Sequence, residues 1–173
     1  MLQLKNVRVL TLATILASLA IVMGFFKLPI SQIVEIRFAS DVIAIAGSLL
    51  GPGVAMIVGA VSDIGGFFIR PTGPFFPGFT ISAALTGLIY GYFLYKKPFN
   101  LKRIITAQIF YSITISSILN TIWLVVLYQL PFYETFITRL ISNVIQLPIH
   151  IIILILLIKG VERFNIFEMP IKK

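Results

Sequence analysis

Long apolar runs separated by short polar breaks make up most of the chain. The breaks KLPISQ, GPG, RPTGPFFPG, KKPFNLKR and LPFYE carry the proline, glycine and charged residues that form turns. A helix needs about 20 mostly apolar residues to cross the hydrocarbon core of a bilayer. The runs lack the two-residue alternation of a membrane barrel, so strands are not expected. The pattern predicts an all-α membrane protein, a single domain over residues 1–173, whose bundle of six transmembrane helices lies at 7–26, 33–50, 54–69, 79–95, 104–130 and 136–158.

Composition points to lipid as the solvent. Hydrophobic residues make up 58% of the chain and charged residues 12%, with a mean hydropathy of +1.03. A soluble domain is about half apolar and a quarter charged. The net charge of +8 would suggest nucleic acid as the partner of a soluble protein. Here the basic residues cluster at the ends of the apolar runs, where the positive-inside rule accounts for them without nucleic acid.

The basic residues also predict an orientation in the cell membrane. If the N-terminus is cytoplasmic, ten of the 14 lysines and arginines fall on the cytoplasmic side and four fall outside. Both termini are therefore expected in the cytoplasm. The start MLQLKNVR, followed by an apolar run, is similar to a signal peptide. Because no small-x-small cleavage site follows, we interpret the run as a retained first helix.

Several kinds of chemistry are excluded by what the sequence lacks. There is no cysteine, which rules out disulfides, thiolate metal sites and cysteine nucleophiles. There is no G-x-x-x-x-G-K-[ST] phosphate loop and no H-E-x-x-H motif. We therefore expect no catalytic residue, no metal and no cofactor. A solute-binding membrane protein without an ATP site implies a partner that supplies the energy.

Polar side chains within the last two predicted helices share faces. Arg139, Asn143, Gln146 and His150 follow offsets of 0, 4, 7 and 11 and form one helical stripe. Ionisable groups are costly in lipid, so their positions carry information. One interpretation is that such groups join neighbouring helices. His150, without a second histidine, is more typical of a structural residue than of a metal ligand.

Other polar residues also gather in the outer half of the predicted bundle. Arg37 and Asp41, four residues apart, share one predicted helix face and could simply pair with each other. A cavity lined by arginine, amide and aromatic groups suits a planar, aromatic, anionic solute, because arginine matches carboxylates and aromatic faces stack on rings. Three pairs of residues in this region each share a helix face: Arg37 with Asp41, Asp63 with Arg70, and Asn120 with Trp123.

The stretch RPTGPFFPGFT at residues 70–80 combines three prolines with three phenylalanines. Proline fixes the backbone φ angle, so the loop is expected to hold nearly one shape. We interpret it as a rigid aromatic lid that presents Phe75 and Phe76 to the mouth of the cavity. The alternative is a tight turn with aromatic anchors at the membrane interface.

A stripe of small residues lies on the first predicted helix. Ala13, Ala17, Ala20 and Gly24 follow offsets of 0, 4, 7 and 11. Small residues allow helices to approach closely in membranes. The stripe is a candidate docking face for a partner, and packing inside the chain's own bundle explains it equally well.

Three segments carry a resemblance to a known family: LLGPGVAMIVGAVSDIGGFFIRPTGPFFPGFTISAALTGLIYGYFLY at 49–95, LNTIWLVVLYQLPF at 119–132, and RLISNVIQLPI at 139–149. The chain resembles the substrate-binding S-components of energy-coupling factor (ECF) vitamin transporters, and among them the folate-specific subunits. Two positions depart from that pattern: Gln129 stands where glycine is usual, and Gln146 stands where an apolar residue is common.

The resemblance implies the six-helix S-component bundle and a high-affinity site for folate or a reduced folate. It implies a transmembrane coupling protein and two cytoplasmic ATPases as partners, in the cell membrane of a Gram-positive bacterium. It also implies roles for single residues. Arg37 and Arg139 would face the anion, Phe75 and Phe76 would form the lid, the pocket would be lined by Asn120, Trp123 and Asn143, and Ala13 and Ala17 would meet the coupling protein. Two alternatives stay open: an S-component for another vitamin such as thiamine or riboflavin, and a structural membrane protein that binds no solute.

Overall fold

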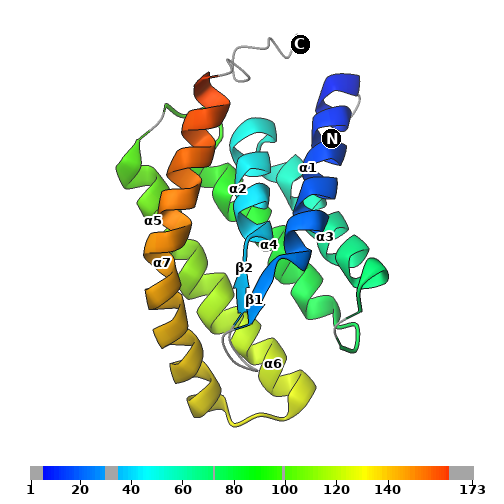
Figure 1. Cartoon of the computed structure of the whole chain (residues 1–173), viewed down its shortest axis with the longest axis vertical. Helices are drawn as coiled ribbons and strands as arrows, with labels where there is room; N and C mark the ends of the chain where they lie inside the picture. The colour runs from blue at the N-terminus through cyan, green and yellow to red at the C-terminus, as the bar shows by residue number, and fades with distance from the viewer. Residues whose placement is uncertain (1–5, 30–34, 72, 99, 164–173) are drawn as a thin grey trace.

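The computed structural model describes residues 6–29, 35–71, 73–98 and 100–163. Its helices run roughly along one axis, and α1 and α7 flank α2 in the view of Figure 1. The first turn of α1 and the last turn of α7 lie at the same end of the bundle (Figure 1). The elements are α1 (Val7–Phe25), β1 (Lys27–Pro29), β2 (Glu35–Arg37), α2 (Ala39–Leu50), α3 (Pro52–Ile69), α4 (Pro77–Leu94), α5 (Leu101–Tyr111), the π-helix η2 (Ser112–Leu119), α6 (Asn120–Tyr128) and α7 (Phe132–Arg163).

Five helices in the described part of the chain are long and apolar enough to cross a membrane. Each coincides with a predicted run, and α5, η2 and α6 together form one of them as a continuous helix of 28 residues. The multi-pass helical architecture is therefore as predicted. The sixth predicted span differs, because α2 has only 12 residues. At 1.5 Å per residue it is about 18 Å long, well short of the bilayer core.

Part of the remainder of that span is the strand β2, which pairs with β1 before the span and corrects the expectation of no strands. β1 pairs with β2 so that Lys27 lies opposite Arg37 and Pro29 opposite Glu35. Hydropathy did not separate this strand from the helix, because most residues at 33–38 are apolar despite Glu35 and Arg37. Several of them are β-branched isoleucine and valine, which favour strands. As a result, Arg37 belongs to a strand and shares no helix face with Asp41.

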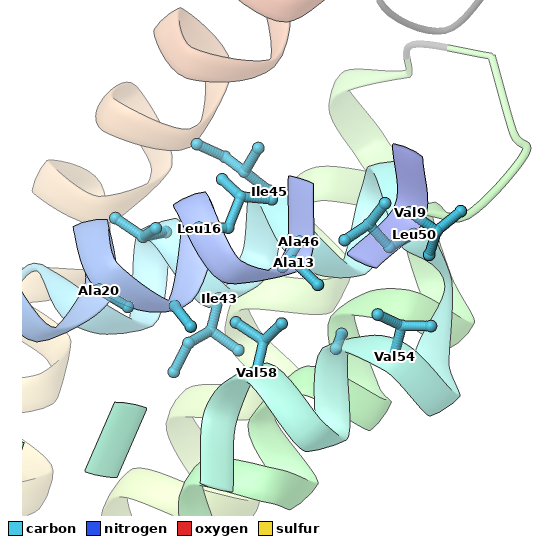
Figure 2. Packing of buried hydrophobic residues seen from close by; sticks show 13 residues of the cluster. Val9, Ala13, Leu16, Ala20, Ile43, Ile45, Ala46, Leu50, Val54 and Val58 are labelled. Atoms are coloured by element: carbon cyan, nitrogen blue, oxygen red, sulfur yellow. The ribbon is translucent and has the colours of Figure 1, made fainter. Parts of the chain in front are cut away.

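The main apolar core lies between α1, α2 and α3. Figure 2 shows α1 side chains packed against residues of α2 and α3. Ala13, Ala17 and Ala20 belong to this core and are 8%, 7% and 1% exposed. These are the residues that the sequence offered as a docking face. Their burial supports the alternative interpretation, in which the small stripe lets α1 approach its own neighbours.

α3 and α4 approach each other even more closely, through glycine. A Cβ atom added at Gly59 would lie 2.2 Å from the backbone oxygen of Ala83 on α4. A Cβ added at Gly87 would lie 2.2 Å from the backbone oxygen of Ala55 on α3. No side chain fits between the two backbones at these positions. The pair therefore forms a tightly packed unit.

Candidate functional site

The polar stripe of α7 faces the π-helix η2. Arg139 donates from Nε to the backbone oxygen of Ser116 at 3.2 Å. The Asn143 side chain makes two contacts, because its Oδ1 accepts from Ser116 Oγ at 2.9 Å and its Nδ2 donates to Ser117 Oγ at 2.8 Å. The structure thus brings two of the expected site residues together on one face. It also adds two serines that the sequence analysis had not named.

Farther along the same stripe, α7 is joined to α2. His150 Nδ1 lies 2.9 Å from Asp41 Oδ2 and 3.1 Å from Oδ1. Both residues are buried, and the ring of Phe38 lies 6.3 Å from the His150 ring, between centroids. The described partner of Asp41 is therefore His150, 109 residues away, and the side chain of Arg37 lies outside the described residues. Gln146, between the two groups on α7, is also buried.

An aromatic group lies where the start of α4 meets α6. The rings of Phe76 and Trp123 are 5.6 Å apart, and Trp123 Nε1 donates to Ser82 Oγ at 3.1 Å. Phe75 points elsewhere, with its ring 5.1 Å from that of Phe67 on α3. It is 45% exposed. The two phenylalanines expected to act as one lid therefore belong to different contacts, and only Phe76 joins the tryptophan.

Asn120 begins α6 one turn before Trp123. Its Oδ1 atom is buried and has no hydrogen-bond partner among the residues that the structure describes. A buried polar atom without a partner costs free energy, and most such atoms in folded proteins have one. This acceptor is therefore a candidate to meet a donor on a bound molecule.

Arg70 and Asp63 do not form the group that their spacing suggested. Arg70 caps the end of α3 and is exposed. Asp63 instead accepts from Thr80 Oγ1 at 2.7 Å, a bond that connects α3 to α4 near the aromatic group. The arginine remains at the edge of the loop that carries Phe75.

The serines on η2 and α4 were missed by the sequence analysis. Ser116 and Ser117 are adjacent in the middle of a long apolar run, and Ser82 lies near the start of another. Single hydroxyl groups in membrane helices commonly bond their own backbone, so they attract little notice. Two neighbouring serines at mid-span, six and seven residues before Trp123, were the available signal.

Taken together, the described residues form a polar group and an aromatic group attached to one helix, Leu101–Tyr128. The polar group supplies a guanidinium and an amide, and the aromatic group supplies two ring faces and the Asn120 oxygen. Guanidinium groups bind carboxylates, amides bind heterocycle edges, and ring faces stack on planar solutes. No group of three or more potential metal ligands occurs among the described residues.

Comparison with known proteins gives a consistent result. A model of the family described as ECF transporter, substrate-specific component, matches residues 8–172. The folate transporter FolT of Clostridium novyi (strain NT) is 36% identical over 165 residues, which cover 95% of this chain and 96% of that protein. FolT of Leuconostoc mesenteroides is 31% identical over 127 residues, covering 70% of this chain and 69% of that protein. A crystal structure of FolT bound with folic acid is similar with a TM-score of 0.81 and 33% identity, covering 88% of this chain and 93% of that one.

Proposed function

Since the chain belongs to the family of substrate-specific components of ECF transporters, we propose that it binds folate at the cell membrane and delivers it to an ATP-driven coupling module. The observation that carries this proposal is the similarity, over nearly the whole chain, to a protein named as a folate transporter. The chemistry of the described groups agrees with it, because folate joins a planar heterocycle to a glutamate with two carboxylates.

Each proposed contact follows from the groups present. Arg139 supplies the fork-shaped cation that matches a carboxylate. Asn143 and Asn120 supply amide groups for the heterocycle, and Phe76 and Trp123 supply faces on which it can stack. Arg37, Arg70 and Phe75 complete the proposed site at its entrance. Asp41 contributes by holding α2 against α7 through His150.

We further propose six crossings with both termini in the cytoplasm. The ends of α1 and α7 at one end of the bundle support an even number of crossings (Figure 1). The strand β2 and the short helix α2 would together make the second crossing, whereas the antiparallel strand β1 continues the first. β1 and β2 pair along their facing edges, which satisfies part of the backbone of this non-helical segment. Cysteine labelling of Lys97 and Arg70 positions from either side of the membrane would test this, with Lys97→Cys reactive from inside and Arg70→Cys from outside.

The proposed partners are a transmembrane coupling protein and two cytoplasmic ATPases, since the chain itself carries no phosphate-binding loop. Docking of the coupling protein on Ala13, Ala17 and Ala20 would require α1 to separate from α2 and α3, because these residues are buried there. Substitution of Ala17 by leucine distinguishes the two roles. A docking role predicts loss of transport with normal folate binding, whereas a packing role predicts a lower melting temperature of the isolated chain.

The proposal is tested by titrating the purified chain with folate in detergent, without ATP or partners. Trp123 is the single tryptophan, so its fluorescence reports on the proposed site, and calorimetry gives the stoichiometry. We expect saturable binding of one folate per chain. Arg139→Ala should weaken it strongly, whereas Arg8→Ala, an exposed arginine in the first turn of α1, should bind like the parent. A calorimetric response to thiamine or riboflavin, with none to folate, would keep the transporter class and reject the substrate. The absence of a calorimetric response to every vitamin tested would reject solute binding.

A further inference from the structure

The eight-residue π-helix η2 interrupts an otherwise α-helical span. π-Helical turns are rare, and they frequently occur at functional sites. In a bilayer they cost additional free energy, because a backbone group left without a partner cannot form a hydrogen bond with water there. The position of η2, directly opposite Arg139 and Asn143, therefore calls for an explanation.

The bond spacing at the end of η2 implies that one backbone oxygen lacks its usual helical partner. At the junction the backbone N–H of Asn120 donates to the oxygen of Ile115, five residues back, and α6 then continues with α-helical bonds. A change from five-residue to four-residue spacing skips one acceptor, and the residue after Ile115 is Ser116. The oxygen of Ser116 is the atom that accepts from Arg139 Nε. The π-helix thus presents an acceptor to this guanidinium.

The serine hydroxyl groups fix the neighbouring amide in the same way. Ser117 Oγ donates its hydrogen to the backbone oxygen of Ser112 at 2.9 Å, so it can only accept from Asn143. The Nδ2 end of the amide must therefore face Ser117, and its Oδ1 end receives the hydrogen of Ser116 Oγ. Each contact uses one of the two donors or one of the two acceptor positions of the amide. The orientation of the Asn143 amide is therefore determined by the serine hydroxyl groups, one of which is itself held by the backbone of η2.

We propose that Ser116 and Ser117 are positioning residues for solute binding, and that η2 is the element that orients Arg139 and Asn143 toward the solute. This inference rests on the proposed function, because it assumes that these two α7 residues contact folate. In this proposal the serines do not contact the solute and affect its binding only by orienting Asn143. A serine that only stabilised the helix would leave the affinity of the folded protein unchanged.

A double-mutant cycle on folate affinity tests the proposal. The dissociation constant is measured by calorimetry for the parent, Ser117→Ala, Asn143→Ala and the double variant, each with its melting temperature. Ser48→Ala is the matched control, because Ser48 is also buried, 2% exposed against 1% for Ser117, and its hydroxyl bonds only its own helix at Ile45. We expect Ser117→Ala to bind folate about 5-fold more weakly, the effect of one net hydrogen bond. The double variant should bind no more weakly than Asn143→Ala, and Ser117→Thr, which keeps the hydroxyl, should bind like the parent.

The outcomes separate this inference from the function on which it rests. If the parent does not bind folate, the proposed function fails and the inference fails with it. If the parent binds and Asn143→Ala binds equally well, the function stands but the serines have no site residue to position. Additive effects of Ser117→Ala and Asn143→Ala would show that Ser117 does not act through the amide. A lower melting temperature with unchanged affinity for Ser117→Ala would reduce the serine to a packing role.

Discussion

A single methyl group at Gly78 should disrupt the proposed aromatic face of the site. A Cβ atom added there would lie 2.4 Å from Cε1 of Phe76 and 2.6 Å from Cδ2 of Trp123. Gly78 is the second residue of α4, and alanine is a good helix former, so the backbone itself tolerates the substitution. The strain of Gly78→Ala therefore arises from these ring contacts. At least one of the two rings has to move.

The size of the effect follows from those distances. Ordinary contacts between carbon atoms lie at about 3.5–4.0 Å, so the rings must move by about 1 Å. Forcing an extra carbon into a packed site typically costs about 1–3 kcal/mol. If folate needs the present ring arrangement, part of this cost falls on the bound state. At about 1.4 kcal/mol per factor of ten, we expect Gly78→Ala to weaken folate binding about 10-fold.

The assay is a folate titration followed by calorimetry and by Trp123 fluorescence. Gly66→Ala is the control, because a Cβ at Gly66 would meet no described atom within 4 Å apart from its chain neighbours and the nearby backbone of α3. It should bind folate like the parent and melt at an equal or higher temperature. Gly78→Ala should also shift the emission of Trp123 before any folate is added. An unchanged dissociation constant together with a shifted emission would mean that the rings moved and folate did not depend on them, which would refute the aromatic part of the site.

Three further predictions concern the polar residues. Asp41→Leu or His150→Leu alone leaves a buried partner unpaired, so either variant should lower the free energy of unfolding by about 3 kcal/mol. The double variant should lose less, and thermal unfolding in detergent measures both effects. Asn120→Leu removes an acceptor that has no partner among the described residues, so it should raise the melting temperature while weakening folate binding; parent-like binding would exclude this oxygen from the site. Arg139→Lys keeps the charge but not the Nε contact to Ser116, and calorimetry should show folate binding about 10-fold weaker; an unchanged affinity would mean that only charge matters there.

The helical part of the fold could be predicted because hydropathy reports directly on lipid contact. Each predicted run contains a helix, and breaks such as GPG fall where helices end: Gly51, with a φ of +85°, separates α2 from α3, and Pro52 begins the next helix. The stripe on α7 was also readable, since one helix fixes the relative positions of Arg139 and Asn143. These features depend only on local geometry.

The remaining features depend on contacts that no spacing reveals. Asp41 had an arginine four residues before it, yet its described partner is a histidine on another helix. The strand at Glu35–Arg37 pairs with Lys27–Pro29, and hydropathy does not report that contact. The small stripe at Ala13 and Ala17 has the same spacing whether it meets a partner or its own bundle. In each case the deciding interaction is tertiary.

The π-helix explains why residues that look like one stripe serve two groups. Ser116, Asn120 and Trp123 are spaced by four and then three residues, so in an uninterrupted α-helix they would share one face. In the structure Ser116 contacts α7, whereas Trp123 contacts Ser82 on α4. A segment with five-residue bonding takes more residues for each turn, so it turns the side chains that follow it toward a different neighbour. η2 therefore does two things at once: it supplies the acceptor that holds Arg139, and it directs Trp123 toward Phe76. In the proposed site, the cation of α7 and the aromatic face of α4 and α6 would therefore meet one folate from different helices, because the span between them is not a regular α-helix.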